Sequence, residues 1–476
     1  MDMIATLAAQ RAAFTAELPV TLAVRRDRLK RARAMIVAGA SRFCEALSED
    51  FGHRSRDQSM LTDIAGSTGP IDHALKHLER WSARDKRPVQ FPLGLLGARA
   101  WVEYQPKGVV GVIAPWNFPV NLVMAPLAGI FAAGNRAMVK TSEFTPATAA
   151  LFEELSPEFF AIEELAFVSG GPEVGKAFAE LPFDHLLFTG ATGIGRHILH
   201  AAADNLTPVT LELGGKSPAI IGQGADLKQA GERIAMGKML NAGQICLAPD
   251  YVLTPAAQEA AVFDALRASA SAMYPTVLAN PDYTSVVNDR HHQRLHDWLD
   301  DARAKGASVE VVNPANEDFG GSNSRKMPLH IVRDVTDDMI LMQEEIFGPV
   351  LPIVKYDGID GAIDRVNRGP RPLGLYYFGP DKAERRRVLD RTISGGVTLD
   401  DVVFHVSMEE LPFGGVGPSG MGAYHGRDGF RTFSHAKAVF KQSRIDVAKL
   451  AGLKPPYGAK LRKTVAKQIG VREPSA

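Results

Sequence analysis

The feature that most constrains the fold of this chain is a regular alternation of strand-length and helix-length segments between residues 108 and 213. Apolar runs that suit buried strands are separated by stretches of about 10–15 residues with helical spacing. Parallel strands require such crossovers, so the alternation predicts an α/β fold with a doubly wound parallel sheet covered by helices on both faces. The expected strands are VVGVIAP, RAMVKTS, LAFVSGG, DHLLFTG and TPVTLELGG.

Helices are expected before this region and a second α/β set after it. Up to about residue 80, apolar positions recur at three- and four-residue steps, and one helix is expected to end at Gly52 with Cys44 buried inside it. The basic run Arg25–Arg33 is interpreted as the solvated face of that helix. The second set, at about 216–396, has the expected strands SPAIIG, YVLTP, MPLHIVRD and VLPIVKY.

Two segments fall outside these sets. Residues 87–108 begin with prolines and continue in strand-like alternation, which predicts a hairpin arm. The glycine-rich stretch after residue 396 gives way to a Lys-rich tail from about residue 447, which is expected at the surface. No internal repeat is present.

Charge and cysteine content limit the partners and the compartment. Lys plus Arg and Asp plus Glu are equal at 54 each, so no net field attracts nucleic acid or an anionic membrane. Two cysteines do not form a disulfide framework, which favours reduced thiols in the cytoplasm. The first residues lack the apolar core of a secretory signal, and the longest apolar run, Leu122–Gly134, is too short for a membrane span. We therefore expect a cytoplasmic protein without a nucleic-acid or membrane partner.

Two glycine-rich turns indicate an anion-binding crevice. In FTGATGIGRHI, Gly190 and Gly195 bracket the turn from an expected strand into a helix, whose first N–H groups are free to bind an anion. The turn SGGPEVGKAF comes one strand earlier, and two turns on neighbouring strand ends would form a switch-point crevice. The first turn differs from the G-x-G-x-x-G fingerprint, so alone it is only a weak indication of a dinucleotide site.

Three polar residues fit a chemical and a structural role equally well on local grounds. In PWNFPV, prolines fix the backbone around Asn117, whose amide either stabilises an oxyanion or caps the next helix. In LELGGKSP, Glu212 ends an apolar strand, where a carboxylate is either solvated or chemically active. In NAGQICLAPD, Cys246 is either an inert loop thiol or a nucleophile that lacks a histidine nearby in the sequence.

Seven motifs together carry a family resemblance. PWNFP, VKTSE, FTG-x4-G, LELGGKSP, NAGQ-x-C, EEIFGP and PFGG-x-G-x-SG follow one another in this order. The set resembles the aldehyde dehydrogenase superfamily, and the ending PFGGVGPSGMGAYHGRDGFRTFSH resembles its class 3 branch. With DFGHRS and HVSMEELPFGG, the chain is most similar to the bacterial coniferyl aldehyde dehydrogenases of that branch.

The resemblance implies a catalytic mechanism and assigns its residues. Cys246 would attack the aldehyde to give a thiohemiacetal, with the oxyanion held by Asn117 and the backbone N–H of Cys246. Hydride transfer to a nicotinamide would leave a thioester, and Glu212 would activate the water that releases the acid. A base that acts in this second step explains why the thiol needs no histidine.

The resemblance also implies a nicotinamide cofactor and its contacts. Lys140 and Glu143 would meet the adenosine ribose, and Glu345 would meet the nicotinamide ribose with Phe347 beside the ring. A carboxylate at Glu143 favours NAD, while the Lys140 ammonium leaves NADP open. The complete set of implied cofactor residues is Trp116, Lys140, Glu143, Thr189, Gly190, Gly195, Glu345 and Phe347.

The resemblance also assigns a function to each expected domain. Residues 1–86 and 109–213 are expected to form a Rossmann-like dinucleotide-binding domain, and 214–396 an α/β catalytic domain. Residues 87–108 and 397–446 would form a small bridging and oligomerisation β element, with 447–476 as a C-terminal tail. The resemblance implies a homodimer built through that element.

Two local features qualify the resemblance. Class 3 members usually have Asn where this chain has Asp400, which either adds a charge at the substrate entrance or faces water. In HHQRLH, His292 and His296 have the helix-face spacing of metal ligands, but the polar flanks favour a solvated helix, and the family needs no metal.

The favoured function is NAD(P)-dependent oxidation of an aldehyde, aromatic or hydroxycinnamyl such as coniferaldehyde, to the acid. A dehydrogenase for medium- or long-chain aliphatic aldehydes remains an alternative. An acylating enzyme would hand the thioester to coenzyme A, and the presence of Glu212 argues for hydrolysis instead. A cofactor-independent thiol esterase or a non-catalytic binding protein is disfavoured because the cofactor turns, the thiol and the glutamate are all present.

Overall fold

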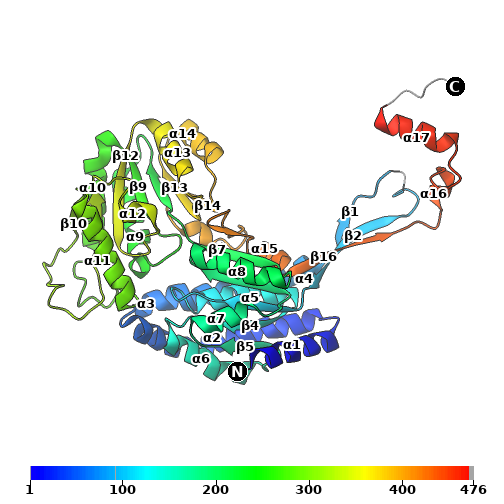
Figure 1. Ribbon diagram of the computed structural model, residues 1–476, viewed down its shortest axis with the longest axis horizontal. Coiled ribbons are helices and arrows are strands. Elements are labelled where there is room, and N and C mark those ends of the chain that lie inside the picture. Colours follow the sequence, from blue (N-terminus) through cyan, green and yellow to red (C-terminus); the bar gives the residue numbers. More distant parts are fainter. Residues whose placement is uncertain (1, 92, 471–476) are drawn as a thin grey trace. The chain divides into compact units, whose positions relative to one another are not determined.

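The computed structural model describes residues 2–91 and 93–470 (Figure 1). The chain forms two compact units. The larger unit contains the residues up to Trp81 together with 106–434, and the smaller contains 82–105 together with the residues from His435 onward. Both large sheets lie within the larger unit.

The first large sheet is the expected doubly wound sheet. Its order is β15-β7-β6-β3-β4-β5, and every pairing is parallel except that of β15 with β7. Between the strands run α5 (Asn121–Ala133), α6 (Pro146–Phe159), α7 (Pro172–Ala179) and α8 (Thr192–Asp204). Right-handed crossovers place α5 and α6 on one face and α7 and α8 on the other. The strands are β3 (Val109–Ile113), β4 (Arg136–Lys140), β5 (Leu165–Val168), β6 (His185–Gly190), β7 (Val209–Leu213) and β15 (Gly420–Met421).

The strand order corrects the expected position of the crevice. The two glycine-rich turns follow β5 and β6, which are consecutive in sequence but separated by β3 and β4 in the sheet. The order reverses between β3 and β6, so the switch point lies at the ends of these two strands. The segment PWNFPV follows β3, and it therefore shares the crevice with the turn that begins at Gly190.

The second large sheet has three more strands than the sequence indicated. Its order is β10-β11-β12-β9-β8-β13-β14, with only β10 antiparallel to its neighbour. β13 is fully buried, and an apolar run of this kind has no periodicity that marks it as a strand. The strands are β8 (Pro218–Ile221), β9 (Tyr251–Pro255), β10 (Ser308–Val311), β11 (His330–Arg333), β12 (Val350–Tyr356), β13 (Gly374–Phe378) and β14 (Gly396–Leu399).

Helices cover this second sheet and lead into the last part of the larger unit. The α-helices are α9 (Leu227–Met239), α10 (Glu259–Met273), α11 (Asp289–Ala304), α12 (Ile340–Gln343), α13 (Gly358–Arg368), α14 (Lys382–Arg391) and α15 (Gly426–Thr432). Short 3-10 turns are η2 (Leu240–Gly243), η3 (Ala256–Gln258) and η4 (Phe404–Ser407). The apolar core on one side contains Leu295, Leu299 and Ile363 from α11 and α13, packed on Leu253 and Leu375 of the sheet.

The N-terminal region is helical, as expected. It comprises α1 (Met3–Glu17), α2 (Leu22–Phe51), α3 (Arg56–Ser59), the π-helical segment η1 (Met60–Ala65) and α4 (Gly66–Ser82). Gly52 ends α2 in a left-handed conformation, and Cys44 is buried within the helix, both as predicted. The basic run is not wholly solvated: Arg25 and Arg28 are buried. Arg28 is accommodated because it pairs with Glu17 at 2.7 Å and with Glu164 at 3.0 Å.

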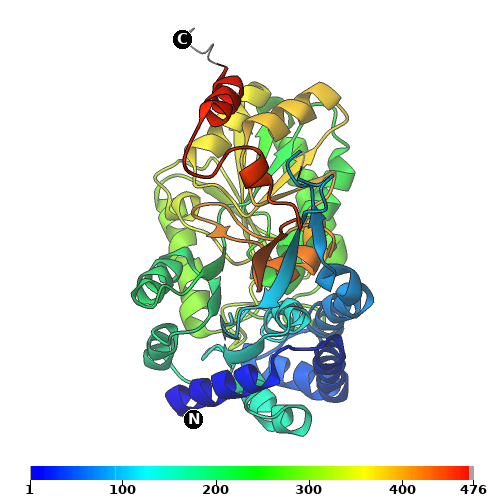
Figure 2. The ribbon, with the colours of Figure 1, turned by 90° about the vertical axis from the view of Figure 1, so that its right-hand side faces the viewer.

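The smaller unit is a three-stranded sheet followed by the tail. β1 (Asp85–Arg87) and β2 (Arg99–Pro106) pair antiparallel, which confirms the hairpin arm, and β16 (Ser434–Lys441) completes the sheet on the other side of β2 (Figure 2). The tail helices α16 (Val447–Leu450) and α17 (Ala459–Ile469) contain no buried residue, as expected of a surface segment; 471–476 lie outside the described residues.

The second segment of the smaller unit begins at His435, whereas the second segment of the bridging element was expected to begin at residue 397. Residues 397–434 belong to the larger unit, because β15 pairs with β7 and α15 packs against α5. Within the described part of the chain, no helix combines the length and apolarity needed to cross a bilayer.

Candidate active site

Cys246 lies in the loop between η2 and β9, directly after a strained turn. Asn241, Ala242 and Gly243 all have positive φ angles, of 51°, 51° and 73°. Non-glycine residues in this conformation cost about 1–3 kcal/mol each, so neighbours must hold them. The Gln58 side chain accepts from the Asn241 N–H at 3.0 Å, and Gln244 donates to the carbonyl oxygens of Asn241 and Ser285. The backbone that presents the thiol is thus fixed from several sides.

The amide of Asn117 reaches this loop. Its Nδ2 donates to the Gln244 carbonyl oxygen at 3.2 Å, two residues before the thiol. The backbone carbonyl oxygen of Asn117 accepts from Arg54 Nη1 at 2.8 Å and from Asn241 Nδ2 at 3.1 Å. The structure therefore brings Asn117 beside the Cys246 loop, and the hydrogen bond of Nδ2 directs the side-chain amide toward that loop rather than toward the next helix.

The guanidinium of Arg54 is a positioning element that sequence reasoning missed. Arg54 and Asp63 are both fully buried and pair at 2.6 Å, and Asp63 also accepts from the N–H groups of Val120 and Asn121. The pair joins the N-terminal helices to the middle and to the C-terminal end of the Asn117 turn. In the sequence, the one feature that could have indicated this role is DFGHRS, where Arg54 follows the end of a helix.

We expect Arg54→Met to destabilise the protein by about 3–5 kcal/mol, because it leaves the buried carboxylate of Asp63 without its counter-charge. Chemical denaturation followed by circular dichroism measures this difference. Arg56→Met is the matched control, since Arg56 is exposed and its replacement should cost no more than about 0.5 kcal/mol. Equal stability of the two variants would contradict the assigned role.

Glu212, at the end of β7, is buried rather than solvated. Its residue exposure is 1%, and neither carboxyl oxygen has a hydrogen-bond partner among the described residues. Burial raises the pKa of Glu212 well above its usual value. Its charge in turn contributes to raising the pKa of Cys246, so the two groups lie within electrostatic range of each other. A buried carboxyl of raised pKa beside a thiol has the properties of a general base.

A second buried carboxyl, Glu345, lies against the same turn. A Cβ added to Gly214 would fall 2.2 Å from Glu345 Oε2, so only glycine admits the carboxyl there. Burial and the nearby charge of Asp250 raise the pKa of Glu345 to about 8. Its Oε1 has no hydrogen-bond partner within the described chain, which leaves an acceptor for a bound ligand.

An ion pair that the sequence did not reveal joins three of the motifs. Lys216 from LELGGKSP pairs with Asp250 from NAGQICLAPD, and it donates to the carbonyl oxygens of Leu341 and Glu344 at 2.8 and 2.9 Å. Asp250 also accepts from the Ile346 N–H at 2.8 Å. The segment EEIFGP is thereby tied to the Cys246 loop.

The thiol of Cys246 retains some solvent exposure but lies deep among protein atoms. Burial is the largest cause that raises its pKa well above the usual value, and the charges of Glu212 and Glu345 add to it. Backbone N–H groups oppose the shift without cancelling it. The N–H groups therefore favour the thiolate, but burial and the two carboxylates outweigh them.

The raised pKa of Cys246 should make its alkylation depend on pH. In the absence of cofactor, the rate of alkylation of Cys246 by iodoacetamide should reach half its maximum above about pH 8.5, the ordinary thiol value. Glu212→Gln removes one opposing charge, so its midpoint should move to lower pH. Cys44→Ala in both proteins ensures that a single thiol is followed. A midpoint below that of an ordinary thiol, or a shift to higher pH in Glu212→Gln, would contradict the assignment.

Trp116 and Phe347 meet in an aromatic group near the thiol loop. Their ring centroids are 5.2 Å apart, and the ring of His291 lies 5.2 Å from Trp116 on another side. Burial lowers the pKa of His291 to about 4, so this histidine is neutral at pH 7. The segment HHQRLH is thus only partly solvated, and its first histidine belongs to the wall of the site. The rings of His292 and His296 meet edge to face with centroids 4.6 Å apart, and the two residues belong to no group of three potential metal ligands in the described residues.

The remaining predicted cofactor residues surround the switch point. Lys140 ends β4, with its buried ammonium 3.2 Å from the carboxylate of the half-exposed Glu143. Thr189 is buried and stands opposite Glu212 in the pairing of β6 with β7. A Cβ at Gly195 would meet Leu213 Cδ2 at 2.9 Å, so this glycine permits close packing of α8 on β7. The cap of α8 is Ala191, which satisfies none of the first N–H groups with its side chain.

The sequence did not indicate two further residues of the site, Tyr424 and Lys238. Tyr424 is buried, and burial together with the charges of Glu212 and Cys246 raises its pKa well above the usual value. In the sequence, the feature that could have indicated Tyr424 is its position within the glycine-rich stretch 412–426. Lys238 of α9 is buried with no hydrogen-bond partner for Nζ among the described residues, and burial lowers its pKa to about 8. Asp400 does not simply face water: it pairs with Arg385 at 2.9 Å and has a φ of 56°.

Comparison with known proteins identifies the family. The model of the aldehyde dehydrogenase family matches residues 1–439. The chain belongs to the aldehyde dehydrogenase family. It is 55% identical over 461 residues to a probable coniferyl aldehyde dehydrogenase of Caulobacter vibrioides. The matched region covers 97% of this chain and 95% of that protein. It is 53% identical over 441 residues to the coniferyl aldehyde dehydrogenase of a Pseudomonas species, covering 92% and 90%.

A solved structure agrees with this assignment. The substrate-bound structure of Staphylococcus aureus AldH superimposes with a TM-score of 0.91 at 35% identity, covering 98% of this chain and all of the other. As a member of the aldehyde dehydrogenase family, the protein is an oxidoreductase that uses a nicotinamide cofactor to oxidise an aldehyde. The family resemblance, the α/β fold and the dehydrogenase activity expected from the motifs are therefore confirmed.

Proposed function

We propose that this aldehyde dehydrogenase oxidises aromatic aldehydes of the hydroxycinnamyl class, such as coniferaldehyde, to their carboxylic acids by a hydrolytic route. The observation that carries the hydrolytic route is the buried carboxyl of Glu212, which lacks a hydrogen-bond partner among the described residues and lies close enough to raise the pKa of Cys246. The substrate class is supported by the names of two relatives that are 55% and 53% identical over nearly the whole chain.

The proposed mechanism divides the work between two residues. The Cys246 thiol gives its proton to solvent as Sγ attacks the aldehyde carbon, and the resulting oxyanion of the thiohemiacetal accepts hydrogen bonds from Asn117 Nδ2 and the backbone N–H of Cys246. The bound nicotinamide supplies the acceptor for the hydride, and a thioester on Cys246 remains. Glu212 then takes a proton from water, which attacks the thioester carbon, and the C–S bond breaks to release the acid while the departing sulfur takes that proton from Glu212 to reform the thiol.

The residues present fit a nicotinamide dinucleotide. The N-terminus of α8 offers N–H groups without a side-chain cap to a pyrophosphate, and the unsatisfied Oε1 of Glu345 suits a ribose hydroxyl. Trp116, Thr189, Gly190 and Gly195 would line the crevice, and Phe347 would lie beside the nicotinamide. We assign the adenosine ribose to Lys140 and Glu143 and favour NAD over NADP, because Glu143 would repel a 2′-phosphate while the neighbouring ammonium softens that repulsion.

We assign functions to the parts of the chain as follows. Residues 1–86 and 109–213 bind the dinucleotide, 214–396 carry the thiol chemistry, and the smaller unit links two subunits in a homodimer. The edge strand β16 supports the last assignment, because its free edge can pair with another strand. Exposed apolar side chains in the same unit, such as Phe440 and Leu450, also favour a partner. We keep the cytoplasm as the proposed location on the basis of the two free cysteines.

The test measures NAD(P)H absorbance with coniferaldehyde, benzaldehyde, hexanal and succinic semialdehyde, each with NAD and with NADP. The proposal predicts the highest kcat/KM for coniferaldehyde with NAD and no requirement for coenzyme A. A preference for hexanal would replace the substrate class with aliphatic aldehydes. A requirement for coenzyme A would overturn the hydrolytic route, and ester hydrolysis without any NAD(P)H would indicate a thiol esterase.

A further inference from the structure

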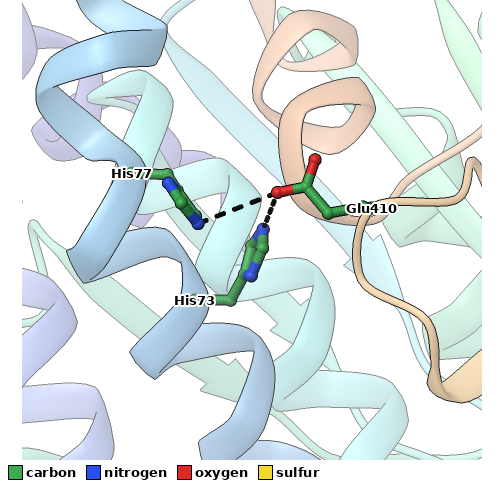
Figure 3. A group of neighbouring side chains, drawn as sticks. All are labelled: His73, His77 and Glu410. Carbon is green, nitrogen blue, oxygen red and sulfur yellow. Dashed lines mark ion pairs between the residues drawn. The ribbon is translucent and has the colours of Figure 1, made fainter.

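A cluster of two histidines and a glutamate lies apart from the residues assigned to catalysis. His73 and His77 are four residues apart on α4, and Glu410 lies in the turn after η4 (Figure 3). Glu410 Oε1 is 3.2 Å from His73 Nε2 and 3.7 Å from His77 Nε2. Among the residues that the structure describes, this is the one group of three side chains whose ligand atoms all lie within 4.8 Å of one another.

The spacing of these atoms suits a metal ion. Ligand atoms on a tetrahedral ion with bonds of about 2.0–2.1 Å lie roughly 3.3 Å from each other, close to two of the distances observed here. Residues four apart on a helix share one face, so both imidazoles approach the same point, as Figure 3 shows. Two imidazoles and one carboxylate form a ligand set that zinc and related divalent ions prefer.

The surroundings leave the histidines available. His73 Nε2 is buried and, apart from the Glu410 carboxylate 3.2 Å away, it has no partner among the described residues. The ring of Trp81 packs 5.6 and 5.8 Å from the two imidazoles and limits their rotation. The cations that face the cluster are Lys76 and Arg80, and Arg80 reaches Glu410 at 3.5 Å. An ion must therefore displace this exposed contact, which is weak.

We propose that His73, His77 and Glu410 form a binding site for a divalent transition-metal ion of the zinc class, with water completing the coordination. The site joins α4 to the turn that precedes the glycine-rich segment at 412–426. Binding to the folded state alone stabilises that state, so the ion raises the thermal midpoint of unfolding. The ion is not needed for the oxidation of the aldehyde.

The test measures binding of Zn²⁺ by calorimetry and of Co²⁺ by visible absorption in the full-length protein carrying Cys246→Ser, so that the catalytic thiol cannot bind the ion. We expect one equivalent to bind and to raise the thermal midpoint. His77→Gln and Glu410→Gln should each weaken binding at least about tenfold, because even changes outside the coordination shell commonly cost that much. Both side chains lie near the surface, so folding without metal should be unchanged.

The second histidine pair of the chain provides a matched control. His292 and His296 are also four apart on a helix, but they belong to no group of three potential metal ligands in the described residues. His296→Gln should leave the affinity and the thermal shift unchanged. Absence of binding, equal binding in His77→Gln, or loss of binding in His296→Gln would each overturn the proposal. None of these outcomes depends on the substrate or on turnover.

Discussion

Replacement of Cys246 by alanine should abolish aldehyde-dependent NAD(P)H formation, with a loss in kcat of at least about ten-thousand-fold, as for removal of other enzymatic nucleophiles. The thiol forms the bond that places the substrate carbon for hydride loss and then holds the acyl group. No other described residue near Glu212 offers a second thiol, because Cys44 is buried within α2. The measurement is the steady-state rate with saturating aldehyde and cofactor.

The matched control for this variant is Cys44→Ala. Cys44 is buried in the N-terminal helical region, and its replacement should leave kcat unchanged apart from a modest loss of stability. Cofactor binding by Cys246→Ala, followed by fluorescence quenching, should persist. Substantial turnover in Cys246→Ala would remove the thiol from the mechanism.

Replacement of Glu212 by glutamine should stop the second half of the reaction and spare the first. The amide keeps the shape of the side chain but cannot accept the proton of water, so kcat should fall by about 10²–10⁴-fold, the usual contribution of a general base. Because the thioester still forms, each active site should release one equivalent of NAD(P)H in a rapid burst. Stopped-flow absorbance separates the burst from the slow phase.

Glu345→Gln is the control for removing a buried carboxyl from the same pocket. Glu345 lies against Gly214, two residues from Glu212, but it is assigned to the cofactor ribose. Its replacement should raise the KM for the cofactor without producing a burst followed by a stalled phase. A stalled acyl-enzyme in Glu345→Gln and normal turnover in Glu212→Gln would reverse the two assignments.

The sequence predicted the fold well where local periodicity and strand length decide it. The five strands between Val109 and Leu213 and the helices between them are present as expected, and Gly52 ends α2 as its position indicated. The order of the strands was not predictable in the same way. It depends on contacts between distant segments, and the two glycine-rich turns proved to follow strands separated by two others.

The sequence also indicated polar residues whose position in a strand or turn is unusual. It did not indicate the partners that hold these residues in place. Asn117, Glu212 and Cys246 stood out locally, and the structure brings them into one region. The buried pair Arg54–Asp63 and the pair Lys216–Asp250 could not be found this way, because a charged residue is usually solvated and nothing nearby marks it as buried. Lys238 was missed for the same reason.

The proposed mechanism requires a covalent thioester at Cys246 that Glu212 hydrolyses, and intact-protein and peptide mass spectrometry of Glu212→Gln can detect it. The variant is mixed with coniferaldehyde and NAD, quenched in acid during the stalled phase and digested. We expect the peptide that contains Cys246 to gain the mass of a feruloyl acyl group, and we expect no such gain when NAD is omitted. An unmodified Cys246 peptide after a full burst of NADH would contradict the proposed mechanism.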